Sequence, residues 1–343
     1  MDLYPILKKG LFLLDAEQAH NLTFAAMGWA GGALLGPFAP SRQLIWSHPV
    51  QISGLSFKNR VGLAAGLDKN ALRLPAWEQL GFGHVEIGTV TPLPQDGNPK
   101  PRLFRLPADN ALLNRMGFNN DGADRIRDRL DERPPADRLI VGGNIGKNKA
   151  TPDADAPADY VRCLRRLHDA VDYFTINVSS PNTPGLRGLQ SREPLLRLLG
   201  DVQTANQGVV RPRPLFVKIA PDLTEAEVAD VVFVAEACQL AGIVATNTTL
   251  SRDGLRTPAP DVKSLGAGGL SGQPLTERAQ AFAQRLRALM PASLALIGCG
   301  GIMAGQDAAS RLAAGAALVQ LYSGLVYHGP GLVADCLRAT QAR

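Results

Sequence analysis

Residues 172–188, DYFTINVSSPNTPGLRG, combine a strand pattern with a loop that neither a strand nor a helix can contain. Residues 172–178 are mostly aromatic or β-branched, as in a buried strand. Residues 179–188 hold two prolines and two glycines among Ser and Asn residues, and these break both periods. A buried strand therefore ends in a polar loop, and Asn177, Ser180 and Asn182 lie at this strand end. An ordinary strand-to-helix turn explains this stretch equally well. The residues at the other strand ends are therefore needed to distinguish a ligand site from such a turn.

The same order of elements recurs towards the C-terminus: an apolar run, a loop rich in Gly, Asn, Thr or Ser, and an amphipathic helix. The eight runs are 61–65, 84–88, 139–143, 172–178, 215–220, 242–247, 294–298 and 317–322. Eight alternating strands and helices predict an α/β fold, a closed (β/α)8 TIM barrel. A hairpin around Gly54 is expected before it, and the long connections 91–120 and 248–273 are expected to be functional or disordered loops.

The composition excludes several classes of protein. The chain has 343 residues, 45% of them hydrophobic, which is enough for a large core. A net charge of +5 suits anionic ligands or an anionic membrane surface, and is too weak to indicate nucleic acid. Cys163, Cys238, Cys299 and Cys336 are scattered, which argues against disulfides or a zinc site and favours a reducing compartment.

Residues 1–43 predict a small two-helix extension, and residues 44–343 the barrel domain. Asp15 is expected to cap the second helix. The stretch 23–40 lacks charge, but glycines and prolines interrupt it, so we expect no transmembrane helix. An apolar helical pair next to Lys8 and Lys9 suits an anchor on anionic lipid, although packing on the barrel would explain the same pattern.

The carboxyl ends of barrel strands form the active face. Here almost every end carries a hydrogen-bonding side chain or a glycine, and Asp68 is the main carboxylate. No carboxylate pair, HExxH motif or acyl-transfer triad is indicated. Gly300 and Gly301 after the seventh strand predict a phosphate site. Lys218 lies in an apolar strand, so we expect its ammonium to face an electron-rich cofactor ring; a lysine reaching solvent from an edge strand is the alternative.

Seven segments together resemble the dihydroorotate dehydrogenases of class 2, the quinone-linked type. They are 62–70 (GLAAGLDKN), 88–102 (GTVTPLPQDGNPKPR), 114–120 (NRMGFNN), 177–187 (NVSSPNTPGLR), 217–222 (VKIAPD), 246–248 (TNT) and 268–272 (GGLSG). The likeness covers nearly the whole chain. It implies oxidation of dihydroorotate to orotate in pyrimidine biosynthesis, with hydride passing to FMN and electrons then to a membrane quinone.

The resemblance also implies site residues. The FMN contacts would be Ala65, Gly66, Lys69, Thr89, Asn144, Asn177, Lys218, Thr246, Gly272, Gly301, Tyr322 and Ser323. The substrate contacts would be Lys69, Asn114, Arg115, Met116, Gly117, Phe118, Asn177, Asn182, Asn247 and Thr248. His20, Arg102 and Tyr322 would line the quinone site. Ser180 would be the catalytic base, and because the soluble class carries a cysteine there, the serine favours class 2. No metal is implied.

The implied partners are dihydroorotate or orotate, and ubiquinone or menaquinone, with no nucleic acid. Residues 1–43 would hold the protein on the cytoplasmic face of a bacterial inner membrane as a peripheral protein. Three alternatives stay open: a flavin barrel that acts on uridine in tRNA, which would need a basic extension; a phosphate-binding barrel without catalysis; and a soluble dihydroorotate dehydrogenase that reduces fumarate or NAD.

Overall fold

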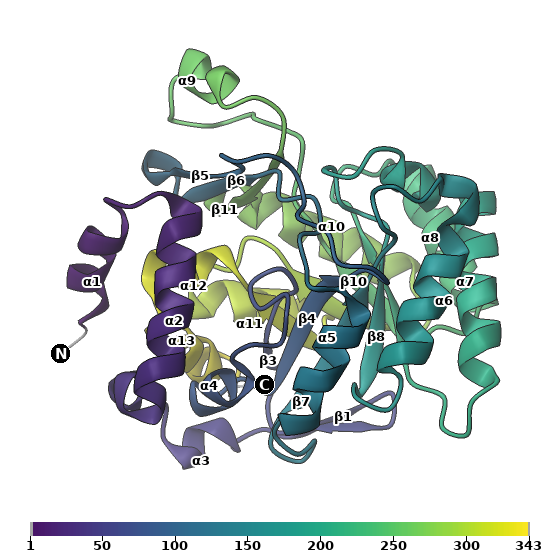
Figure 1. Cartoon of the computed structure of the whole chain (residues 1–343), viewed down its shortest axis with the longest axis horizontal. Coiled ribbons are helices and arrows are strands. Elements are labelled where there is room, and N and C mark those ends of the chain that lie inside the picture. The colour runs from purple at the N-terminus through teal and green to yellow at the C-terminus, as the bar shows by residue number, and fades with distance from the viewer. Residues whose placement is uncertain (1–2, 342–343) are drawn as a thin grey trace.

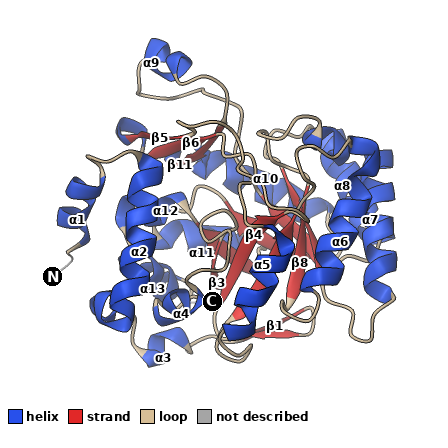
Figure 2. Cartoon of the chain, viewed as in Figure 1, coloured by secondary structure: helices blue, strands red, loops and turns tan. Residues whose placement is uncertain are grey.

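The computed structural model describes residues 3–341, apart from the side chains of residues 30–34. Eight parallel strands close into a barrel in the order β10-β12-β13-β3-β4-β7-β8-β9, which confirms the predicted fold (Figure 2). The strands are β3 (Val61–Leu63), β4 (His84–Val90), β7 (Ile140–Ile145), β8 (Tyr173–Asn177), β9 (Leu215–Ile219), β10 (Gly242–Ala245), β12 (Ala295–Cys299) and β13 (Leu318–Leu321). Each lies within or overlaps one of the eight apolar runs.

Helices surround the strands and bury aliphatic side chains against them. They are α4 (Leu74–Gln79), α5 (Gly122–Arg129), α6 (Ala156–Leu167), α7 (Arg192–Gln207), α8 (Glu225–Ala237), α10 (Thr276–Leu289), α11 (Gly305–Ala313), α12 (Ser323–His328) and α13 (Gly331–Ala339). The 3-10 helices are η1 (Gly36–Phe38), η2 (Pro107–Asp109), η3 (Leu130–Glu132), η4 (Asp153–Asp155), η5 (Leu186–Gln190) and η6 (Gln273–Leu275). Local chemistry sets some ends: Thr224 and Glu227 form a capping box at the start of α8.

The hairpin β1 (Val50–Ile52) and β2 (Leu55–Phe57) forms around Gly54 as predicted. Ser53 and Gly54 both have positive φ, 50° and 79°, which matches the right-handed twist of the two strands. The hairpin packs against the amino ends of the barrel strands, where the ring of Phe57 meets His84 edge-on at 5.5 Å. It therefore covers the end of the barrel opposite the active face.

The two long connections hold a second sheet that the sequence analysis did not predict. Strands β5 (Leu103–Leu106), β6 (Ala111–Asn114) and β11 (Gly269–Gly272) pair antiparallel in the order β11-β6-β5. The sheet lies beside the barrel mouth, with α9 (Ala259–Ser264) projecting beyond it (Figure 1). The pairing joins Asn114 to Gly269, far apart in sequence, so no local pattern announces it. These connections are ordered rather than structureless.

The N-terminal segment forms α1 (Tyr4–Leu11) and α2 (Ala16–Leu35), followed by α3 (Arg42–Ile45). Asp15 caps α2 as expected, because its Oδ1 accepts the N–H groups of Glu17 and Gln18 at 2.9 and 3.2 Å. Both helices lie along one side of the barrel (Figure 1). In the part of the chain that the structure describes, no helix is long and apolar enough to cross a bilayer.

Candidate active site

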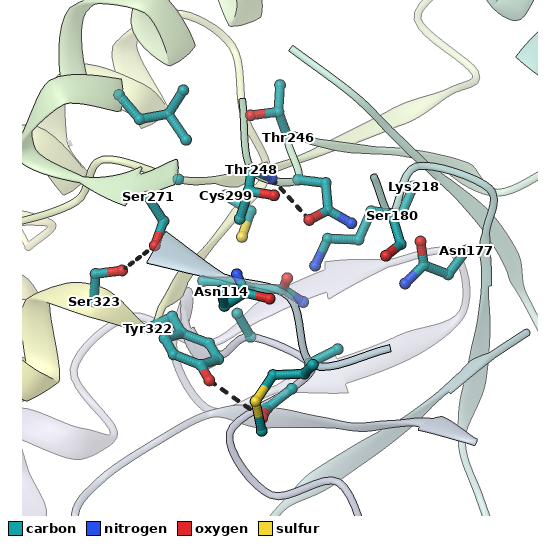
Figure 3. Close-up of a pocket in the computed structure, with 18 of the residues that line it drawn as sticks. Asn114, Asn177, Ser180, Lys218, Thr246, Thr248, Ser271, Cys299, Tyr322 and Ser323 are labelled. Carbon is teal, nitrogen blue, oxygen red and sulfur yellow. Dashed lines mark hydrogen bonds between the residues drawn. The ribbon is translucent and has the colours of Figure 1, made fainter. Parts of the chain in front are cut away.

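One pocket opens at the carboxyl ends of the barrel strands and brings together most of the predicted site residues (Figure 3). Those of the predicted FMN set are Ala65, Gly66, Lys69, Thr89, Asn177, Lys218, Thr246, Gly301, Tyr322 and Ser323. Those of the predicted substrate set, besides Lys69 and Asn177, are Asn114, Met116, Gly117, Phe118, Asn182, Asn247 and Thr248. Ser180 also lines it. The unforeseen sheet contributes to the wall through Asn114 on β6 and Ser271 on β11.

Five predicted residues do not line this pocket. Asn144 lies behind its wall, where it accepts hydrogen bonds from Thr89 and Asn177. Gly272, next to Ser271, packs on the backbone of Asn110. Arg115 turns outwards, because its guanidinium donates to the Ala267 and Pro101 carbonyls and stacks on Phe104. The other two, His20 and Arg102, belong to the contact between α2 and the barrel, described below.

Ser180 is buried in the loop after β8. Its Oγ accepts the backbone N–H of Asn182 at 3.2 Å, and the Asn182 amide in turn donates to Asn114 Oδ1 at 3.1 Å. We call the side of the pocket formed by Asn177, Ser180, Asn182, Asn247 and Thr248 the Ser180 wall. It consists of amides and hydroxyls carried on the ends of β8 and β10, with no carboxylate among them.

One arginine that the sequence analysis did not select holds this wall together. Arg187 donates to the Ser179 carbonyl (3.0 Å), to the Thr248 carbonyl (2.9 Å) and to the Asp222 carboxylate (2.9 Å). Its guanidinium therefore joins the loops after β8, β9 and β10. Arg187 lies in the same sequence motif as Ser180, but its distant partners depend on the barrel closing.

Lys218 lies in the middle of the barrel sheet, since β9 pairs with both β8 and β10. It is therefore not an edge lysine. Its side chain is buried at the pocket wall, and the described residues supply no hydrogen-bond or ion-pair partner for its ammonium. A buried cation without a partner is unfavourable, so this group is available to a ligand.

Three buried polar atoms beside the pocket also lack a partner among the described residues. They are Thr246 Oγ1, Thr248 Oγ1 and Gln320 Oε1. An unpaired buried polar atom costs about 1–3 kcal/mol. Together with Lys218 they match a ligand with a polar heterocyclic edge. Gln320 is a further residue that the sequence analysis did not select.

The glycine loop after β12 has the geometry expected of an anion site. Gly300 and Gly301 have φ of 94° and 68°, and a Cβ on Gly301 would lie 2.4 Å from Thr276 Cα. Behind the loop, buried Arg311 donates to the carbonyls of Cys299 (3.4 Å) and Gly300 (3.2 Å). Burial lowers the pKa of Arg311 to about 10, and no carboxylate of the described chain pairs with it within ion-pair distance. The loop therefore combines close backbone approach with a nearby cation.

The opposite side of the pocket faces α2. Tyr322 lines the pocket there, and His20 and Arg102 lie outside it; we call these three residues the Tyr322 wall, and Lys69 lies beside them. The Gly66 carbonyl accepts from Lys69 Nζ (2.9 Å) and from the Tyr322 hydroxyl (3.3 Å). Burial, then the Arg102 charge, lower the pKa of Lys69 to about 8. Burial, then the Lys69 charge, lower the pKa of His20 to about 4, so the imidazole is neutral at physiological pH. His20 and Arg102 both interact electrostatically with Lys69, although neither of them lines the pocket.

Arg102 is engaged by the protein. Its Nε and Nη2 donate to the two oxygens of Glu17 on α2 at 3.1 and 2.7 Å, and Nη1 donates to the Asn98 carbonyl at 2.9 Å. A bidentate pair of this kind is among the stronger ionic contacts in proteins. It fastens α2 to the barrel beside the Tyr322 wall.

Comparisons with known proteins agree with this geometry. Residues 48–342 match the family model for dihydroorotate dehydrogenase. The chain is 47% identical to dihydroorotate dehydrogenase (quinone) of Stenotrophomonas maltophilia, over 99% of this chain and 97% of that protein. It is 53% identical to the enzyme of the same name from Nocardioides sp., over 92% and 90%. The solved structure of ligand-free DHODH from Eimeria tenella superposes with a TM-score of 0.85 at 37% identity, covering 95% of this chain and 94% of that one.

Proposed function

This chain belongs to the dihydroorotate dehydrogenase family, as a quinone-dependent enzyme that oxidises dihydroorotate to orotate in pyrimidine biosynthesis, and we propose how its pocket performs that reaction. FMN lies across the barrel mouth, the substrate lies against the Ser180 wall, and Ser180 is the catalytic base. The main support is that Ser180, the unpaired Lys218 and the glycine loop border one pocket. Full-length relatives named as quinone enzymes argue against the soluble fumarate or NAD alternative.

The residues present suit FMN. Gly300, Gly301 and the cation of Arg311 provide for its phosphate, and Lys218, Thr246 and Gln320 present unpaired polar groups to its ring edge. The remaining expected contacts are Ala65, Gly66, Lys69, Thr89, Asn177, Tyr322 and Ser323, with Asn144 and Gly272 supporting them from behind. Bound FMN would supply the hydride acceptor.

The substrate suits the Ser180 wall. Dihydroorotate has a planar amide edge and a carboxylate, and the amides of Asn114, Asn182 and Asn247 can bond the first while the Lys69 ammonium pairs with the second. Buried donors and acceptors of this kind reject analogues that leave them unpaired. Phe118, with Met116 and Gly117, closes the apolar side of the pocket.

Oxidation removes a proton from C5 and a hydride from C6, and the electrons left in the C5–H bond form the C5=C6 double bond of orotate. Ser180 Oγ takes the C5 proton. Because this Oγ accepts the Asn182 N–H, its own hydrogen stays free to pass to a second acceptor. A serine hydroxyl is a weak base, so it needs an acceptor for its own proton while it takes the proton from C5.

The Tyr322 wall and the N-terminal helices serve the quinone. One side of the helical pair packs on the barrel, where the Tyr4 hydroxyl donates to the Val326 carbonyl at 2.7 Å. Large apolar side chains of this segment are exposed: Trp29 is 97% exposed, Leu13 88% and Ile6 69%. Apolar area beside the exposed Lys9 favours peripheral binding to anionic lipid, on the cytoplasmic face of a bacterial inner membrane. The Lys8 ammonium instead donates to the Tyr327 carbonyl at 3.1 Å. Ubiquinone or menaquinone would then enter beside His20, Arg102 and Tyr322.

Anaerobic mixing tests the proposal. Dihydroorotate should bleach the flavin absorbance of FMN-loaded protein, and a short-chain quinone should restore it whereas fumarate and NAD should not. A purified chain that retains no flavin after incubation with FMN would contradict the proposed pocket.

A further inference from the structure

A buried carboxylate that the proposed reaction does not use lies beneath the pocket. Glu86 on β4 has no solvent exposure. Its oxygens accept hydrogen bonds from Asn144 Nδ2 (2.7 Å), Gln320 Nε2 (2.9 Å) and Thr175 Oγ1 (3.0 Å), and the Tyr173 hydroxyl lies at 3.4 Å. All four neighbours act as donors, and the described residues place no cation within ion-pair distance of Glu86. These surroundings satisfy an ionised carboxylate, which only accepts hydrogen bonds.

Glu86 determines which way the Asn144 amide points. The amide nitrogen is committed to the carboxylate, so Oδ1 faces the pocket wall. There it accepts from Thr89 Oγ1 at 2.5 Å and from Asn177 Nδ2 at 3.1 Å. If the Asn144 amide were turned over, it would present N–H groups both to Asn177 and to Thr89, and its oxygen would face the carboxylate.

The orientation continues through the Ser180 wall. Asn177 Nδ2 is committed to Asn144 and Thr89, so its Oδ1 accepts the Ser179 hydroxyl at 2.9 Å. Ser179 Oγ in turn accepts from Asn247 Nδ2 at 2.9 Å. Every donor from Asn247 to Asn144 therefore points towards Glu86. This row of bonds crosses the ends of β10, β8 and β7.

The same carboxylate orients the floor of the pocket. Because Gln320 Nε2 donates to Glu86, its Oε1 is the atom left without a partner beside the pocket. A ligand there meets an acceptor and not a donor. The carboxylate thus selects the hydrogen-bonding groups that the pocket presents at Gln320, Asn177 and Asn247.

We propose that Glu86 is a positioning residue that fixes the donor–acceptor direction of Asn144, Asn177 and Asn247, and through the last two, which belong to the Ser180 wall, the affinity and selectivity of the pyrimidine site. The inference rests on the proposed position of dihydroorotate at the Ser180 wall. A neutral glutamine at this position has only one acceptor oxygen for four donors. At least one neighbouring amide would then have to turn or stay unpaired, because the glutamine N–H groups would oppose other donors.

The test compares the affinity of orotate for two FMN-loaded proteins, the wild type and Glu86→Gln. Binding is measured from the change in flavin absorbance. Orotate should bind the variant about tenfold to a hundredfold more weakly, which is the effect of one or two mispaired buried groups.

Asp172→Asn is the matched control. Asp172 is another buried carboxylate, but it lies at the amino end of β8 and pairs with Arg133 at 2.8 Å. This variant should lower the melting temperature and leave orotate affinity unchanged. An equal loss of affinity in the control would overturn the inference, as would wild-type affinity in folded Glu86→Gln.

Should Glu86→Gln fail to fold, Glu86→Asp takes its place. It keeps the charge but withdraws it by one methylene from Asn144 and Gln320, so orotate affinity should fall below wild type. Unchanged affinity in this variant would also overturn the inference. Failure of the wild type itself to bind orotate would instead contradict the proposed function.

Discussion

The two walls of the pocket are held in place in different ways. The Ser180 wall stands on strand ends inside the barrel, and buried hydrogen bonds join its side chains to one another, to Arg187 and to Glu86. The Tyr322 wall is completed by α2, a helix from the chain terminus that is fastened by Glu17 and Arg102 and exposes apolar side chains on its outer side. A rigid wall suits proton and hydride removal, whereas a peripheral helix suits contact with a lipid-soluble acceptor. The two half-reactions should therefore fail separately.

Deletion of residues 1–43 should give the largest effect. Quinone reduction should be lost, because both the exposed apolar surface and His20 are removed, while dihydroorotate should still bleach the flavin in part. Stopped-flow bleaching and steady-state quinone reduction separate the two. An equal loss in both assays would mean that the walls are not independent.

Ser180→Ala should slow the other half-reaction, the reduction of the flavin by dihydroorotate. Loss of a general base slows proton removal by about 10²–10⁴-fold. The change removes one oxygen that accepts a single N–H bond, so orotate affinity should change little. Rapid-mixing measurements of flavin bleaching beside orotate titrations check this. Bleaching at near the wild-type rate would assign the base to another group.

Arg187→Met should weaken the Ser180 wall without removing any group that touches the substrate. Three loops lose their common donor, and we expect a fall in kcat of about tenfold, which corresponds to the energy of about one hydrogen bond to a charged group. FMN content should stay unchanged, because the glycine loop is not involved. Arg192→Met is the control: Arg192 pairs with Asp230 and stacks on Phe233 at the surface, and its loss should leave kcat as in wild type.

The last effect, which is small near neutral pH, concerns the pH dependence of orotate binding. Since the pKa of Lys69 is lowered to about 8, its ammonium is charged below that pH and becomes neutral as the pH rises through it. Affinity for the orotate carboxylate should therefore be constant between about pH 6 and 7 and fall about tenfold per unit well above pH 8. Titrations between about pH 6 and 10 test this, and Lys69→Met should bind weakly with no such dependence. A flat wild-type profile over that whole range would show that Lys69 does not pair with the carboxylate.

Much of this architecture follows from local pattern. The apolar runs, the turn at Gly54 and the cap at Asp15 are each decided by neighbouring residues, so the barrel strands, the hairpin and the start of α2 could be predicted. The sheet of β5, β6 and β11 could not, because its strands come from connections far apart in the chain. Arg115 shows the limit within a motif: its neighbours line the pocket, while its own side chain turns to Phe104.

By itself the sequence determined the eight-unit barrel and the residue types offered at its mouth, since short-range periodicity and turn chemistry suffice for both. Only the tertiary structure decided how those side chains are oriented. The direction of the Asn144, Asn177 and Gln320 amides depends on the carboxylate of Glu86, which reaches them across neighbouring strands. A hydrogen bond between distant residues is set by the closed sheet, and no stretch of sequence contains that information.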